Sequence, residues 1–193
     1  MPPCPLYRYL ALVWNIESPE GGEYAAQMAR HFQEKSPTWS LIFHEPGLMI
    51  FHDGERSGAM QTYPLGKSGG VIVGRLFTRA RSEGSSGETP VLPGREAQKI
   101  IDSHGKHLLE NYWGRYVAFI HQKQENASLV MRDPTGGLPC YHAHHRGVEI
   151  IFSHMADCAR FGLGPFTINW TYVAAYLKFP LLQQHRCGLN EVS

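Results

Sequence analysis

The chain has 193 residues, the usual size of one domain and enough to bury a core without disulfide or metal support. It carries 18 Lys and Arg against 17 Asp and Glu, and the net charge of +1 gives no electrostatic footprint for nucleic acid or an anionic membrane. With 42% hydrophobic and 18% charged residues, the composition excludes a generally disordered chain.

Compartment signals favour a cytoplasmic protein with reduced thiols. No apolar run approaches the ~18 residues of a membrane span, and the first residues lack the basic and apolar regions of a secretory signal. The cysteines form no Cys-x-x-Cys pair, which excludes zinc-ribbon and thioredoxin-like motifs. They are Cys4, Cys140, Cys158 and Cys187.

Short apolar runs separated by turn residues predict about nine strands. The clearest hairpin signal is Glu45-Pro46-Gly47, and a flexible polar loop is expected between 79 and 93. The expected strands span 7–15, 39–43, 48–52, 61–65, 70–77, 115–121, 128–132, 138–142 and 148–153.

Helical spacing of apolar residues predicts two main helices, at 23–34 and 95–112, although Gly105 interrupts the second pattern. Shorter helices are expected at 155–160 and 169–179. Many strands joined by short turns, with helices between them, favour the α+β class. The number of strands suggests two packed, mainly antiparallel sheets covered by helices.

Three local motifs have a functional and a structural interpretation. His142 and His144 would share one face of a strand and suit a metal, but no further ligand is evident, so we favour an exposed strand end and predict no metal. The 66–70 stretch lacks the spacing and the following helix of a phosphate loop, which favours a turn. Residues 113–116 either form a recognition patch or, as we expect, a glycine turn that sends aromatic side chains into the core.

The segment 109–153 carries a family resemblance. It contains Trp-Gly-Arg-Tyr-Val-Ala-Phe-Ile from Trp113 and Arg-Asp-Pro-Thr-Gly-Gly-Leu-Pro-Cys-Tyr from Arg132. It resembles the N-terminal glutamine amidotransferase domain of asparagine synthetase homologues. The resemblance implies a four-layer αββα sandwich of the N-terminal-nucleophile (Ntn) hydrolase type, over residues 1–165. Residues 166–193 are similar to the start of the linker into the ATP-dependent synthetase domain.

The resemblance also implies which residues to compare with the family's catalytic groups. The family's nucleophile is a cysteine exposed by removal of the initiator Met, but here Pro2 takes that place, and Cys4 is the nearest thiol. The family's oxyanion strand reads Asn-Gly-Glu, matched here by Val73-Gly74-Arg75. Its substrate-binding Asp is matched by Gly94. The best arginine for the glutamine carboxylate is Arg56.

These replacements predict that glutaminase activity is lost and that the pocket is vestigial. No catalytic residue is expected. The pocket would comprise Val73, Gly74, Arg75, Gly94 and Glu96. Arg132 and Asp133 are expected to fix a hairpin, while Cys140 and Cys158 are expected to be core thiols.

The branch most similar to this chain is that of the lasso-peptide cyclases, whose synthetase domain activates a side-chain carboxyl of a precursor peptide. The resemblance implies a structural or substrate-recognition domain. Its expected partner is the synthetase domain, and the candidates for further partners are a ribosomal precursor peptide and its processing protease. No nucleic acid or membrane is expected as a partner. The chain itself would need no cofactor, whereas ATP and Mg would serve the synthetase domain expected to follow Ser193. The alternatives are an active glutaminase that uses processed Cys4, and a stand-alone binding module.

Overall fold

The computed structural model describes residues 8–35, 38–53, 61–79, 92–160, 162, 165–179 and 187–193. These residues form two antiparallel sheets with helices, which confirms the α+β class and the two-sheet expectation. The five-stranded sheet has the order β2 (Trp39–Glu45), β3 (Leu48–Asp53), β1 (Tyr9–Trp14), β9 (Val148–Phe152) and β8 (Tyr141–His145). The four-stranded sheet has the order β4 (Gln61–Pro64), β5 (Gly70–Thr78), β6 (Tyr112–Gln122) and β7 (Ala127–Arg132).

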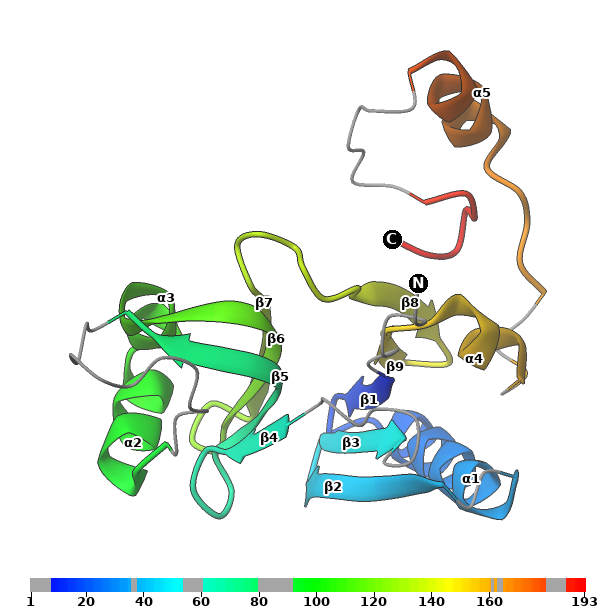
Figure 1. Cartoon of the computed structure of the whole chain (residues 1–193). Helices are drawn as coiled ribbons and strands as arrows, with labels where there is room; N and C mark the ends of the chain where they lie inside the picture. Colours follow the sequence, from blue (N-terminus) through cyan, green and yellow to red (C-terminus); the bar gives the residue numbers. More distant parts are fainter. Residues whose placement is uncertain are drawn as a thin grey trace.

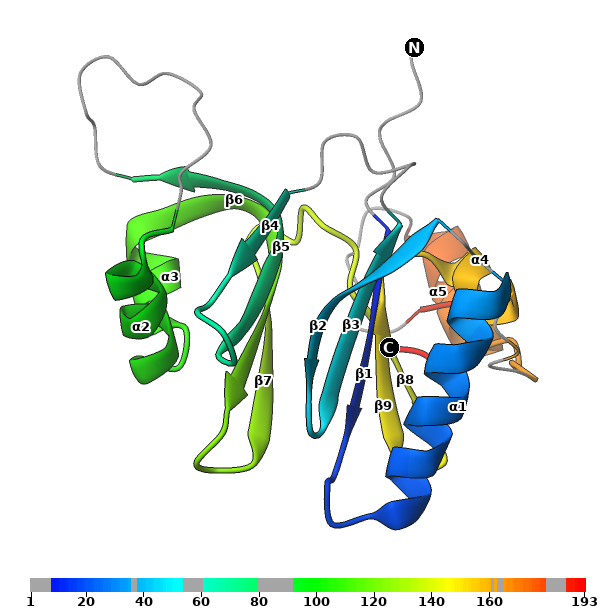
Figure 2. The ribbon, with the colours of Figure 1, turned by 90° about the horizontal axis from the view of Figure 1, so that it is seen from below.

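The two sheets pack face to face, and a helix layer covers the outer face of each (Figure 2). Helix α1 (Pro19–Lys35) covers the five-stranded sheet, while α2 (Gly94–Asp102) and α3 (Lys106–Asn111) cover the four-stranded sheet. The described residues are thus arranged in four layers: helix, sheet, sheet and helix.

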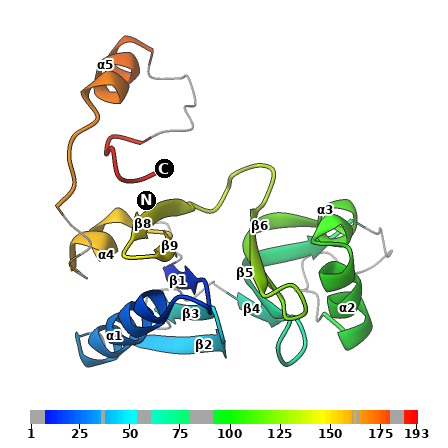
Figure 3. The same ribbon diagram turned by 180° about the vertical axis from the view of Figure 1, so that it is seen from behind.

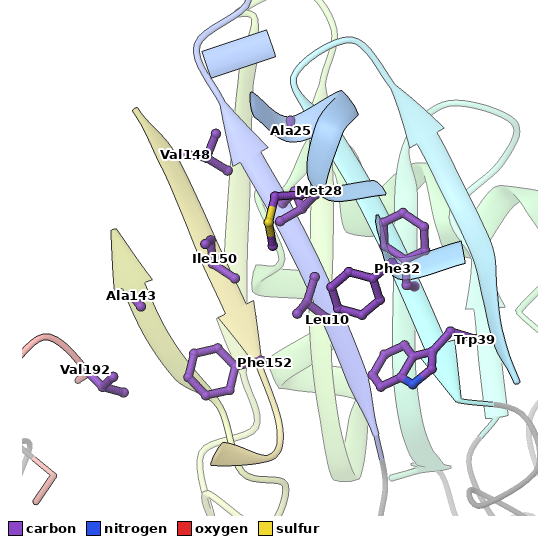
Figure 4. Close-up of a cluster of buried hydrophobic side chains, with 12 residues drawn as sticks. Leu10, Ala25, Met28, Phe32, Trp39, Ala143, Val148, Ile150, Phe152 and Val192 are labelled. Atoms are coloured by element: carbon purple, nitrogen blue, oxygen red, sulfur yellow. The ribbon is translucent and has the colours of Figure 1, made fainter. Parts of the chain in front are cut away.

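Alternating apolar residues explain this layering, because each strand presents its two faces to different cores. The central core joins both sheets through residues such as Tyr9, Ile50, Val73 and Phe119. Beneath α1, Met28 and Phe32 meet Leu10 and Phe152 in the cluster shown in Figure 4. The third cluster lies between α2, α3 and the four-stranded sheet, and includes Ile72, Ile100, Leu108, Tyr116 and Ala118.

Several elements differ in their bounds from the sequence-based expectation. Helix α1 begins at Pro19 rather than at 23, because proline suits a first turn and the Ser18 hydroxyl accepts a hydrogen bond from the Gly21 N–H. The helix expected over 95–112 is two helices separated by Gly105, whose φ is +83°. The strand expected over 138–142 is instead β8, at Tyr141–His145.

The C-terminal part of the chain extends away from the four layers (Figures 1 and 3). After α4 (Met155–Arg160), the described chain continues in α5 (Trp170–Lys178), which has no buried residue. The last residues return to the five-stranded sheet, where Val192 bridges to Ala143 and Ser193 exchanges backbone hydrogen bonds with His142. None of the helices in the described segments has both the length and the apolar character needed to cross a membrane.

Candidate functional site

Strand alternation brings two arginines and two aromatic residues to one end of the four-stranded sheet, on the face that packs against the five-stranded sheet. We call this face the inter-sheet side. On β5, Val71 and Val73 belong to the central core, whereas Ile72 and Leu76 face α2 and α3. Side chains two residues apart share a face, so Arg75 and Phe77 continue the row of Val71 and Val73. The same reasoning places Trp113 and Arg115 of β6 in the row of the core residues Val117 and Phe119.

The four side chains form two cross-strand pairs, and we call them the arginine face. Arg75 lies directly opposite Arg115, and Phe77 lies opposite Trp113. The two aromatic rings stack with centroids 4.6 Å apart. Both arginines are exposed, and Trp113 retains 54% of its accessible surface. The arginine face is therefore a solvent-accessible extension of the central core.

Gly74 permits the close approach of the strands behind this face. Its φ is +127°, and a Cβ built there would lie 2.2 Å from the Arg115 carbonyl oxygen. A side chain at this position would therefore push β5 away from β6.

The segment from Asp133 to Cys140 covers the stem of Arg115. Asp133 is buried and its carboxylate accepts hydrogen bonds from the backbone N–H groups of Tyr116, Thr135 and Gly137. A Cβ on Gly137 would lie 2.6 Å from Arg115 Cγ, which places this arginine against the segment. Asp133 thereby fixes the turn whose backbone supports the arginine face.

Arg132 adds a third guanidinium group beside this segment. Its side chain donates a hydrogen bond of 2.9 Å to the Gly136 carbonyl oxygen and remains exposed. Because Arg132 pairs with Val117 in the sheet register, it occupies the same face as the core residues. Arg132 and Asp133 thus make contacts within the turn of the kind expected of residues that fix a hairpin.

Cys140 lies beside this end of the central core, next to Tyr9. The Tyr9 hydroxyl donates to the Pro139 carbonyl oxygen over 2.8 Å. Burial raises the pKa of the Cys140 thiol, although its hydrogen bond with Tyr9 and the charge of Arg132 act in the opposite direction. Burial likewise raises the pKa of Tyr9 well above its ordinary value. Cys140 is therefore largely protonated at neutral pH and poorly suited as a nucleophile.

The expected pocket residues fall on opposite sides of the four-stranded sheet. Val73, Gly74 and Arg75 are consecutive on β5, with the Val73 side chain in the central core. Gly94 and Glu96 belong instead to the first turn of α2, in the outer helix layer. Cys4 and Arg56 lie outside the described residues, and so does the side chain of Cys158.

Glu96 has partners in its own helix layer. It accepts a hydrogen bond of 2.7 Å from Lys99 and lies 2.6 Å from the Nε2 atom of His107. The hydrogen bond from Lys99, followed by that from His107, lowers the pKa of Glu96 to about 2. These contacts tie α2 to α3, so Glu96 joins two helices of the outer layer.

The histidine cluster gains a carboxylate that the local sequence did not suggest. Glu149 of β9 contacts His142, and its other oxygen lies 2.7 Å from His144 Nδ1. Within the described part of the chain, no group of three His, Cys, Asp or Glu has an arrangement that could hold a metal ion. The cluster is thus a hydrogen-bonded contact between the last two strands of the sheet.

For residues 113–116, the predicted glycine turn was wrong, whereas the predicted burial of aromatic side chains is confirmed for Tyr116. Gly114 lies within β6, which begins at Tyr112, and Trp113 is exposed rather than buried. The sequence did contain a signal, because Trp113, Arg115, Val117 and Phe119 alternate at strand spacing. The long helical pattern that ends at 112 concealed that alternation.

No family model matches the chain. No curated protein matches it either.

Proposed function

We propose that this chain is a glutamine-amidotransferase-like domain that has lost glutaminase activity and serves a structural or substrate-recognition role. Its parent would be an ATP-dependent, amide-forming protein of the asparagine synthetase type, and specifically a lasso-peptide cyclase. The layer order supports the proposal, because the resemblance implies helix, sheet, sheet and helix. Taken alone, the domain would neither bind ATP nor form an amide bond.

The observation that carries the loss of activity is the environment of Val73. In the resemblance, this residue takes the place of the asparagine whose amide stabilises the oxyanion in the family, and its side chain is fully buried among apolar groups of the central core. Valine offers no hydrogen-bond donor, and removing one oxyanion donor typically slows such reactions by about 10²–10³-fold. The neighbouring Arg75 replaces a glutamate, so the charge beside this position is reversed.

The surroundings of Cys140 and Cys187 do not favour an activated nucleophile. Burial raises the pKa of Cys140. The Cys187 thiol contacts the carbonyl oxygens of Leu189 and Val192 at the far edge of the other sheet. These surroundings are typical of cysteines that stabilise the fold. Under the mechanism that the resemblance implies, the thiol that would hydrolyse glutamine is that of processed Cys4.

Glutamate release from glutamine tests the proposal, with the Cys4→Ala variant as the matched control. We expect the two proteins to give the same background, and the intact mass to show Met1 or Pro2 as the first residue. Turnover that depends on Cys4 would overturn the proposal and establish the active glutaminase. In the parent protein, Cys4→Ala should leave amide formation unchanged.

A further inference from the structure

The Arg75–Arg115 pair combines two features that the fold alone does not favour. Like charges directly opposite each other on neighbouring strands are destabilising. Among the described residues, no acidic side chain forms an ion pair with either arginine. Residues that lower the stability of the fold in this way are expected at surfaces that bind a ligand.

The stacked aromatic pair beside the arginines indicates the character of the ligand. Phe77 lies two residues after Arg75 and Trp113 lies two residues before Arg115, so the aromatic pair is about 6.8 Å from the arginine pair. Trp113 remains 54% exposed although it stacks on Phe77. An aromatic surface of this size next to two guanidinium groups suits a ligand that carries both a carboxylate and an apolar group.

We propose that the arginine face binds an acidic peptide segment in extended form. A carboxylate of the peptide lies between Arg75 and Arg115, and an aromatic side chain two residues along contacts Phe77 and Trp113. Side chains two residues apart in an extended peptide have the same spacing as the two cross-strand pairs. This inference rests on the recognition role in the proposed function and gives that role a surface and a ligand class.

Charge favours a peptide over a nucleic acid. Binding to a phosphate backbone uses several Lys and Arg side chains spread along a groove, whereas this chain has a net charge of +1. The guanidinium groups are concentrated at one end of the inter-sheet side, where Arg132 supplies a third held by the Gly136 carbonyl. A planar guanidinium group binds a carboxylate through two parallel hydrogen bonds, which fits recognition of Asp or Glu.

The test uses a fluorescein-labelled peptide of sequence Gly-Glu-Gly-Phe-Gly-Glu-Gly and its Gln-for-Glu counterpart, with binding followed by fluorescence anisotropy. We expect the Glu peptide to bind at least about tenfold more tightly than the Gln peptide, and more weakly as salt is raised. Arg75→Gln and Arg115→Gln should each weaken binding about tenfold. Arg30→Gln is the matched control, because Arg30 is exposed on α1 outside the arginine face, and it should bind as the wild type does.

The aromatic half of the site has its own matched pair of variants. Trp113→Ala should weaken binding of the Glu peptide several-fold, whereas Trp170→Ala, which removes an exposed tryptophan from α5, should not.

Three results with the peptides would overturn the inference. They are undetectable binding of the Glu peptide, equal affinity for the Glu and Gln peptides, and unchanged binding by both arginine variants. Tighter, arginine-dependent binding of a uridine oligonucleotide would instead assign the face to phosphate and would also overturn it. Because none of these readouts involves glutamine hydrolysis, the inference can fail while the proposed function stands, and the reverse also holds.

Discussion

Arginines occur in two opposite settings in this protein. Arg8 is buried directly before β1, where it pairs with Asp157 and lies 3.5 Å from Asp53. Arg75 and Arg115 are exposed and face each other. A buried guanidinium group is tolerated only when carboxylates compensate its charge, so the first setting belongs to the fold. The second setting costs stability and is explained by binding. The comparison shows that the role of an arginine is indicated by the groups that surround it and not by its residue type alone.

Removing the buried arginine should have the largest effect. Arg8→Ala leaves the carboxylates of Asp53 and Asp157 buried at 1% exposure, and we expect a loss of about 3–5 kcal/mol in the free energy of unfolding. Urea denaturation measures this loss. The matched control Arg30→Ala removes an exposed arginine and should change stability by less than about 0.5 kcal/mol. Arg8→Lys keeps the charge and should lose less than Arg8→Ala. Similar stabilities for Arg8→Ala and Arg30→Ala would remove the distinction between the settings.

The strand contact behind the exposed arginines should be the next most sensitive. Gly74→Ala introduces a Cβ 2.2 Å from the Arg115 carbonyl oxygen at a φ of +127°, so we expect a loss of about 3 kcal/mol. Gly94→Ala is the control, because a Cβ there meets no atom within 4 Å. Thermal unfolding of the two variants distinguishes them. An unchanged Tm for Gly74→Ala would mean that β5 and β6 do not need this close approach.

The exposed hydrogen-bonded contact of Glu149 with His142 and His144 should contribute less, and in a pH-dependent way. Partial burial acts to raise the pKa of Glu149, but hydrogen bonds from His142 and His144 outweigh it, and the pKa is lowered. A carboxylate with a lowered pKa stabilises the fold above its unfolded pKa near 4.5, and this contribution disappears as pH falls through the folded pKa.

Glu149→Gln should therefore be less stable than the wild type at pH 7 by at most about 1 kcal/mol, since the carboxylate is 43% exposed. The difference should shrink as pH falls below about 4.5. Urea denaturation at pH 7 and at pH 3 measures it, with Glu34→Gln on α1 as the control. A difference that grows at low pH would contradict the assignment.

Local patterns were sufficient to predict most strands. The hairpin between β2 and β3 was correctly expected, because apolar alternation and turn residues lie close together in the sequence. The boundary between α3 and β6 was not, since Tyr112 fits the helical stripe as well as the strand. Contact with β5 selects the strand, and no local pattern contains that contact.

The site depends still more on long-range pairing. The register that places Arg75 opposite Arg115 joins residues 40 positions apart, so neither arginine alone signals a pair. The same applies to Glu149, which completes the contacts of His142 and His144 from the next strand. By contrast, the Asp133 turn was predictable, because Asp side chains accept hydrogen bonds from backbone groups two to four residues ahead.

The central claim is that the Arg75–Arg115 pair serves binding at a cost to the stability of the fold. The most direct test is the free energy of unfolding of Arg75→Glu, which replaces two opposed like charges by an opposite pair. The account predicts that this variant is more stable than the wild type by about 0.5 kcal/mol at low salt, while it no longer binds the Glu peptide. A variant less stable than the wild type would show that Arg75 stabilises the fold, and would contradict the claim.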